Sequence, residues 1–212
     1  MKTFIGKSGF AFLEERETRL KQRWFHYSPP ETFAHTTFRS PDWLLWREGQ
    51  HEAAVAAMYA KTTDGVREND RTQIWARNGV RASRLQVVDA LSLADPGSPL
   101  NYLLTYLAVT HPHEDRIIID ADSCTAQGIA LPDVDFLIHD DDLVMTKYEG
   151  TPGVMYRDLY VNAAPEHPGQ DDDRPAFRRY ADLADQLLAQ RQALTYTGPW
   201  AGQALIERLQ PR

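Results

Sequence analysis

Two segments of the chain combine imidazole and carboxylate side chains closely enough for acid–base chemistry. Residues 139–142 read His-Asp-Asp-Asp, and residues 111–115 read His-Pro-His-Glu-Asp. Neighbouring negative charge favours the protonated form of a histidine, and such a group can donate or accept a proton in a reaction. The candidates for a catalytic role are therefore His139, Asp140, Asp141, His111 and His113.

Each segment also has a simpler structural interpretation. Aspartates at 140–142 lie at the tip of an expected hairpin, where turn chemistry favours them, and His139 is then an ordinary histidine at the end of a strand. Residues 111–115 fit a solvated loop. Two histidines there would suit zinc, but no second spaced ligand pair accompanies them. The aspartates lack the calcium-loop spacing Asp-x-Asp-x-Asp-Gly, so we expect no metal site.

The sequence contains none of the common catalytic signatures. It has no glycine-rich phosphate loop, no dinucleotide-binding fingerprint, no Gly-x-Ser-x-Gly elbow and no paired-cysteine zinc motif. The single cysteine, Cys124, has no assignable base beside it, and a thiol nucleophile needs one. Most nucleotide-dependent and triad enzymes therefore lack support, and we expect no cofactor.

A basic run with an aromatic residue is the main candidate for ligand contact. It comprises Arg67, Arg71, Arg77, Arg81 and Arg84, with Trp75 among them. Such a run could contact an anionic ligand or nucleic acid, although a salt-bridged helix surface explains it as well. Aromatic residues further upstream could line a pocket or simply fill the core. The candidate ligand-binding residues are Arg81, Arg84, Trp75, Trp43 and Trp46.

Composition and charge limit the class of protein. The chain has 212 residues, 42% hydrophobic and 25% charged, which is typical of a globular protein that buries its own core. Its net charge of −7 makes nucleic acid an unlikely partner, because phosphate binding usually requires a basic excess. A lone cysteine fits a reducing compartment, and neither a signal peptide nor a membrane-spanning run is apparent. We expect a cytoplasmic protein with no membrane contact.

The hydrophobic pattern predicts an α/β (or α+β) fold. Residues 1–79 read as a helical N-terminal region, and residues 80–195 as a strand–helix–strand–hairpin–strand–helix core. Residues 196–212 form a C-terminal extension, and all three parts are expected to make one compact domain. We predict a mixed sheet of about five strands with a crossover helix, on which the N-terminal helices and a C-terminal helix pack.

Three segments carry a resemblance to a known family: Gly79-Val-Arg, Arg84-Leu-Gln-Val-Val and Ala130-Leu-Pro-Asp-Val-Asp-Phe-Leu-Ile-His-Asp-Asp-Asp-Leu-Val. They resemble the actinobacterial domain of unknown function 6879, across roughly residues 8–190. The chain departs from that family at Leu137 and His139, where the family has aromatic residues, and in its tail beyond Thr195. The strand order also looks like one half of a phospholipase D-like module, as in non-catalytic sensor domains. The His-x-Lys signature of catalytic members is missing.

These observations support three functional hypotheses. The first is a cytoplasmic, non-catalytic protein that binds a small-molecule ligand or a protein partner in a regulatory setting. The second is a small-molecule tailoring enzyme of specialised metabolism that uses the polar cluster of His111, His113, His139 and Asp140. The third is an RNA- or tRNA-contacting protein that uses the arginine run.

Overall fold

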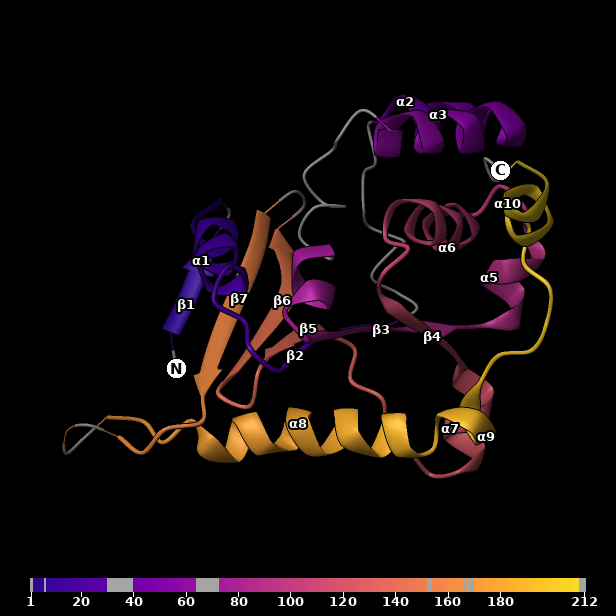
Figure 1. Ribbon diagram of the computed structural model, residues 1–212. Coiled ribbons are helices and arrows are strands. Elements are labelled where there is room, and N and C mark those ends of the chain that lie inside the picture. Colours follow the sequence, from indigo (N-terminus) through magenta and orange to yellow (C-terminus); the bar gives the residue numbers. More distant parts are fainter. Residues whose placement is uncertain are drawn as a thin grey trace.

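A seven-stranded mixed sheet forms the centre of the computed structural model, which describes residues 2–5, 7–29, 40–63, 73–151, 154–165, 167 and 170–209 (Figure 1). The strands lie in the order β1-β7-β6-β5-β2-β3-β4. Their bounds are β1 Lys2–Ile5, β2 Arg23–Ser28, β3 Arg81–Val88, β4 Asp115–Asp120, β5 Asp135–His139, β6 Leu143–Thr151 and β7 Val154–Val161.

The sheet has a parallel part and an antiparallel part, which meet at β2. Strands β2, β3 and β4 are parallel, and β2 pairs with β5 in the antiparallel sense. Parallel neighbours require crossover connections, and helices provide them here. The expected crossover is confirmed as the connection between the parallel strands β3 and β4.

Helices cover both faces of the sheet. They are α1 Lys7–Glu17, α2 Pro41–Arg47, α3 His51–Thr63, α5 Ala90–Ala94, α6 Pro99–Thr110, α7 Ala121–Ala126, α8 Arg174–Ala189, α9 Arg191–Leu194 and α10 Gln203–Leu209. Figure 1 shows α1 and α6 over one face, with α2 and α3 stacked beyond α6, and α8 along the opposite face. None of the helices in the described part of the chain is long and apolar enough to cross a membrane.

The α8 face of the sheet is an apolar core. Phe25 and Tyr27 of β2, Phe136 of β5 and Leu187 of α8 are among its buried members. Successive residues of a strand point to opposite faces, so Trp24, His26 and Ser28 face the other side of the sheet. That side carries two apolar clusters, one under α1 and one under α6.

The structure confirms an α/β class with a mixed sheet, but it corrects the number of strands from about five to seven. The two additional strands, β1 and β2, come from the stretch that was expected to be helical. The physical reason is burial. The side chains of β2 from Trp24 to Ser28 are all buried, so the strand does not show the polar–apolar alternation of a half-exposed strand. β1 is a short edge strand of four residues.

Candidate functional site

Charged and polar side chains occupy the middle of the face of the sheet that α1 and α6 cover, between the two apolar clusters of that face. We call this set the charged cluster; its members are His26, Ser28, Arg84, Glu114, Asp135 and Lys147. Four adjacent strands, β6, β5, β2 and β3, supply five of the six residues, and Glu114 directly precedes β4. Buried charges of this kind are costly unless they are paired.

Asp135 is the centre of the cluster and is 3% exposed. Its carboxylate accepts hydrogen bonds from His26 Nε2 at 2.8 Å and Ser28 Oγ at 3.0 Å, and it pairs with Lys147 Nζ at 3.0 Å. Burial acts to raise the pKa of Asp135, but its contacts with His26 and Lys147 hold that pKa well below its ordinary range. Asp135 is therefore ionised, and its oxygens serve three donors.

His26 is held neutral in one tautomer. Arg84 Nη1 donates to Nδ1 of the imidazole, so the remaining ring proton lies on Nε2 and points to Asp135. Burial lowers the pKa of His26 to about 4, although Asp135 acts in the opposite direction. Both ring nitrogens are thus occupied, and neither is available to take a proton from a substrate.

Ser28 does not have the surroundings of a catalytic nucleophile. Its Oγ lies 3.3 Å from His26 Nε2, the same nitrogen that donates to Asp135. A Ser–His–Asp triad needs the serine and the carboxylate on opposite ring nitrogens. The hydroxyl of Ser28 donates to Asp135 instead, so these residues form a closed hydrogen-bonded group.

Arg84 connects the charged cluster to a cavity. Its Nε and Nη2 donate to the two carboxylate oxygens of Glu114 at 2.7 and 3.0 Å. Its guanidinium also lies 5.0 Å from the ring centroid of Trp24. Burial acts to raise the pKa of Glu114, but the Arg84 guanidinium lowers it. Arg84 and Glu114 therefore form a neutral, rigid ion pair with one side turned to the cavity.

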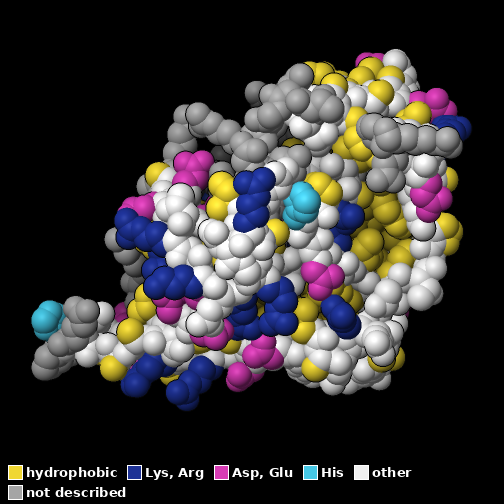
Figure 2. Space-filling model, in the orientation of Figure 1, with side chains coloured by type: hydrophobic (Ala, Val, Ile, Leu, Met, Phe, Trp, Pro, Cys, Tyr) yellow, Lys and Arg dark blue, Asp and Glu magenta, His cyan; other side chains and the backbone are white. Residues whose placement is uncertain are grey.

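This cavity, which we call the α6–β4 cavity, has a volume of about 320 Å³. Figure 2 shows a hollow lined by hydrophobic side chains below α6 on the right of the molecule. A volume of this size is at the lower end of small-molecule sites, which combine apolar walls with a few polar groups. The polar residues in its lining include Arg84, Gln86, Glu114 and Arg116, and the apolar ones include Leu104, Leu107 and Trp200.

The C-terminal tail supplies Trp200 as a wall of the cavity and is fastened to α6. Asn101, which is fully buried, accepts from the backbone N–H of Ala201 at 2.8 Å and donates to the carbonyls of Leu93 and Asp95. Gly202 lies so close to α6 that a Cβ there would come within 1.7 Å of Thr105 Oγ1. The sequence places a glycine where only a glycine allows this approach.

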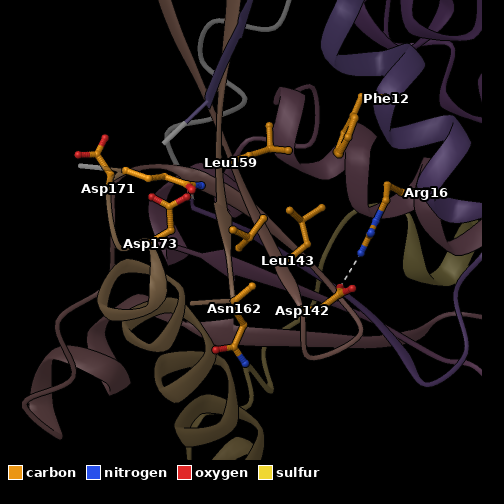
Figure 3. Close-up of a pocket in the computed structure, with 11 residues that line it drawn as sticks. Phe12, Arg16, Asp142, Leu143, Leu159, Asn162, Asp171 and Asp173 are labelled. Atoms are coloured by element: carbon orange, nitrogen blue, oxygen red, sulfur yellow. Dashed lines mark hydrogen bonds and ion pairs between the residues drawn. The ribbon is translucent and has the colours of Figure 1, made fainter. Parts of the chain in front are cut away.

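A second cavity, of about 620 Å³, lies beside the hairpin tip (Figure 3). Its apolar residues include Phe12, Leu143 and Leu159, and Arg16 points to Asp142, with Nη2 2.6 Å from the carboxylate. Its lining is acidic, but the polar groups are already engaged with one another or with other parts of the chain. Among the described residues, none of those that line it has a buried side-chain polar atom without a hydrogen-bond partner, whereas Gln86 in the lining of the α6–β4 cavity has one.

The structure does not bring the catalytic candidates together. His139 lies at the end of β5, three strands away from His111 and His113 at the start of β4. At a strand spacing of about 4.8 Å this separation is about 14 Å. His111 Nδ1 shares a hydrogen bond with Thr110 Oγ1, while His113 is exposed.

The aspartates of the hairpin tip serve the turn. Asp140 has a φ of 50°, and one of its carboxylate oxygens accepts from the backbone N–H groups of Lys21, Gln22 and Arg23 at 3.2, 2.8 and 3.1 Å. Asp141 pairs with Arg23 Nε at 3.0 Å. These contacts anchor the hairpin to the start of β2.

The aromatic ligand-binding candidates lie in the interior. Trp75 donates to the carbonyl of Glu17 beneath α1, and Trp46 donates to the carbonyl of Pro96. Trp43 packs on Tyr102 with 4.9 Å between ring centroids. Of the arginine candidates, Arg81 is exposed and Arg84 lines the α6–β4 cavity. Arg67 and Arg71 lie outside the described residues.

Sequence reasoning did not single out Lys147 or Gln86, and it considered His26 only among the upstream aromatic residues, Asp135 only among the acidic residues of the hairpin, and Glu114 only as part of the 111–115 segment. A signal was present: polar residues recur at alternate positions of otherwise apolar strands, as in Trp-Phe-His-Tyr-Ser at 24–28 and Arg-Leu-Gln-Val at 84–87. Such residues share one face of a strand. The pattern was visible only after β2 had been recognised as a strand.

Comparison with models of known protein families and with curated protein sequences finds no match for this chain. The described residues also contain no group of three or more histidine, cysteine, aspartate or glutamate side chains placed to hold a metal ion.

Proposed function

We propose that the protein is a cytoplasmic, non-catalytic binding protein that holds a small molecule in the α6–β4 cavity and acts in a regulatory setting. The observation that carries this proposal is the state of Gln86. This side chain is 2% exposed and lines the cavity. Its Oε1 has no hydrogen-bond partner within the described part of the chain.

The amide orientation of Gln86 is fixed by its surroundings. Its Nε2 donates to the carbonyl of Ser28 at 3.2 Å and to the carbonyl of Val87 at 2.9 Å. A flipped amide would turn its oxygen towards two carbonyl oxygens, so Oε1 must be the atom left over. A buried acceptor without a partner costs about 1–3 kcal/mol. A ligand N–H or O–H in the cavity would recover that energy.

The closed geometry of the charged cluster supports binding rather than catalysis. Both nitrogens of His26 are occupied, and Arg84 and Glu114 neutralise each other. Cys124 is buried, and burial raises the pKa of its thiol, so a reactive thiolate is disfavoured. A lone buried thiol also suits the proposed cytoplasmic location.

The other hypotheses have less support. A tailoring enzyme built on His111, His113, His139 and Asp140 requires a shared site, and these residues lie on separate parts of the sheet. Arg77 and Arg81 are exposed and could therefore reach RNA, but the net charge of −7 opposes RNA binding. Similarity to the family of unknown function 6879, and at fold level to non-catalytic phospholipase D-like modules, remains part of the proposal. A mixed sheet with helices on both faces is compatible with it.

A ligand screen with a matched pair of variants tests the proposal. Ala108 lines the cavity from α6, so Ala108→Leu fills part of it. Ala57 of α3 is also half-buried but lies elsewhere, so Ala57→Leu is the control. We expect small molecules that raise the Tm of the wild type and of Ala57→Leu, but not of Ala108→Leu. Equal stabilisation of both variants, no stabilising compound, or turnover of a compound that disappears in His26→Ala contradicts the proposal.

A further inference from the structure

We infer that the ligand of the α6–β4 cavity is a compact organic carboxylate with a hydrogen-bond donor at its other end. This inference rests on the proposed function and names the chemistry of its ligand. It depends on the charge balance of the cavity, on the donors that remain on Arg116, and on the position of Gln86.

Among the charged residues in and next to the cavity, one arginine has no carboxylate partner within the described part of the chain. Arg84 is paired with Glu114, and Asp115 is paired with Arg191 Nη1 at 3.1 Å. Arg116 forms no ion pair with any carboxylate of the described residues. The lining itself holds two arginines and two carboxylates; because Arg84 pairs with Glu114 and Asp115 pairs with Arg191 outside the lining, the charge left without an ion-pair partner among the described residues is that of Arg116.

Arg116 is also fixed in place with donors to spare. Its Nη1 donates to the carbonyl of Leu107 at 2.7 Å and to that of His111 at 3.4 Å, where α6 ends. Its Nε and Nη2 make no hydrogen bond within the described part of the chain. Nε and Nη2 lie on one edge of the guanidinium and form a fork that matches a carboxylate.

The strand register makes an anion favourable at this point. Arg84 of β3 is directly opposite Arg116 of β4, and like charges in directly opposite positions repel. Both carboxylate oxygens of Glu114 are hydrogen-bonded to Arg84, so Glu114 acts on Arg116 only from a longer distance. A bound carboxylate would offset the charge of Arg116.

Gln86 would make the second polar contact with the ligand. It is opposite Ile118, one same-face step along the strands from the Arg84–Arg116 pair. Diagonal neighbours of this kind are about 7–8 Å apart, which is close to the length of one aromatic ring with its substituents. The walls between the two polar contacts are apolar: Leu104, Leu107 and the indole of Trp200. A hydroxylated aromatic acid fits this arrangement.

Isothermal titration with three probes of one shape tests the charge preference. The probes are 4-hydroxyphenylacetate, its neutral amide and the cationic amine tyramine. We expect the acid to bind at least about tenfold more tightly than the other two, as a charge-assisted hydrogen bond is lost in both. Arg116→Gln should remove this preference while leaving the affinity for the amide unchanged. Arg174→Gln, which makes the same change of charge on a distant exposed arginine, should preserve it.

The contact with Gln86 is tested separately. Phenylacetate lacks the hydroxyl, so it should bind the wild type several-fold more weakly than 4-hydroxyphenylacetate. In Gln86→Leu the two acids should bind equally, and far-UV circular dichroism confirms that the variant is folded.

Three results would overturn the inference. The first is wild-type binding of the amine or the amide as tight as that of the acid, and the second is an undiminished affinity of Arg116→Gln for the acid. The third is absence of binding by every probe. The proposed function then still stands if other compounds stabilise the wild type but not Ala108→Leu, and it falls with the inference if they do not.

Discussion

Replacing His139 by phenylalanine should stabilise the protein, and more so in mild acid. His139 is 1% exposed, and neither ring nitrogen has a hydrogen-bond partner among the described residues. Burial, together with the nearby Arg16, lowers its pKa to about 4. Between about pH 4 and pH 6.5 the imidazole is therefore neutral in the folded protein and charged in the unfolded chain.

The magnitude follows from the two pKa values. The unfolded histidine titrates near pH 6.5 and the folded one near 4. Below pH 6.5 the unfolded state takes up the proton first, so the free energy of unfolding falls as pH drops from about 6.5 to about 4. At about 1.4 kcal/mol per pKa unit, the loss at pH 5 is about 2 kcal/mol. Phenylalanine cannot titrate, so this loss disappears in His139→Phe.

Urea unfolding followed by circular dichroism at pH 8 and pH 5 measures the effect. We expect His139→Phe to be more stable than the wild type at pH 8, by about 1–3 kcal/mol for two ring nitrogens without partners. The difference should grow by about 2 kcal/mol at pH 5. The same substitution at exposed His113 controls for the loss of a histidine as such. A gain at His139 that is the same at both pH values would refute the assignment of a buried neutral imidazole.

Three further changes should have measurable effects. Asp135→Asn leaves Lys147 without its carboxylate in the charged cluster and should cost about 3 kcal/mol or more in urea unfolding; a cost below 1 kcal/mol would mean that the cluster is solvated. Gly202→Ala places a methyl group against Thr105, so the C-terminal tail should detach from α6 and the fluorescence of the neighbouring Trp200 should shift to longer wavelength; an unchanged emission spectrum would argue against the close approach of Gly202 to α6. Gly79 has a φ of 75° with open space around it, so Gly79→Ala should lower stability by about 1–2 kcal/mol through backbone strain alone, and a neutral outcome would mean that the turn adopts another conformation.

The second half of the fold could be predicted from the sequence because its signals are local. Ser98 and Pro99 mark the start of α6, and the structure shows Ser98 accepting from the N–H of Asn101 at 3.2 Å. The hairpin of β5 and β6 follows from two apolar runs with aspartates between them. In each case the residues that define the element lie within a few positions of one another.

The central strand β2 could not be predicted in the same way. Its neighbours β3 and β5 begin 53 or more residues beyond its end, and only pairing with them places β2 in the middle of the sheet, where helices cover both faces. Without them, the whole of residues 1–79 reads as helical, although α1 ends at Glu17 and Trp24 lies in β2. A central strand is identified by the strands that pair with it, and the hydrophobic periodicity of its own segment carries no information about those strands.

The candidate site depends on the same missing strand. Asp135 was regarded as one of several acidic residues around a turn, and Asp140 as a candidate catalytic group. Register reverses their roles: Asp135 points into the buried face beside His26 and Ser28, whereas Asp140 caps the backbone of 21–23. A shift of the pairing by one residue would exchange the buried and exposed sets. The roles of the aspartates therefore follow from strand pairing more than from their order in the chain.

Arg84 links the charged cluster to the α6–β4 cavity. Its donors are shared between His26 in the charged cluster and Glu114 at the cavity, so the cluster holds the guanidinium in place while the cavity stays neutral at that point. Arg116, its opposite neighbour, is held only by the carbonyls that close α6. The buried network therefore engages each of the three guanidinium nitrogens of Arg84, whereas Arg116 keeps Nε and Nη2 without a hydrogen bond within the described part of the chain. This difference between the two arginines is what the proposed carboxylate ligand would use.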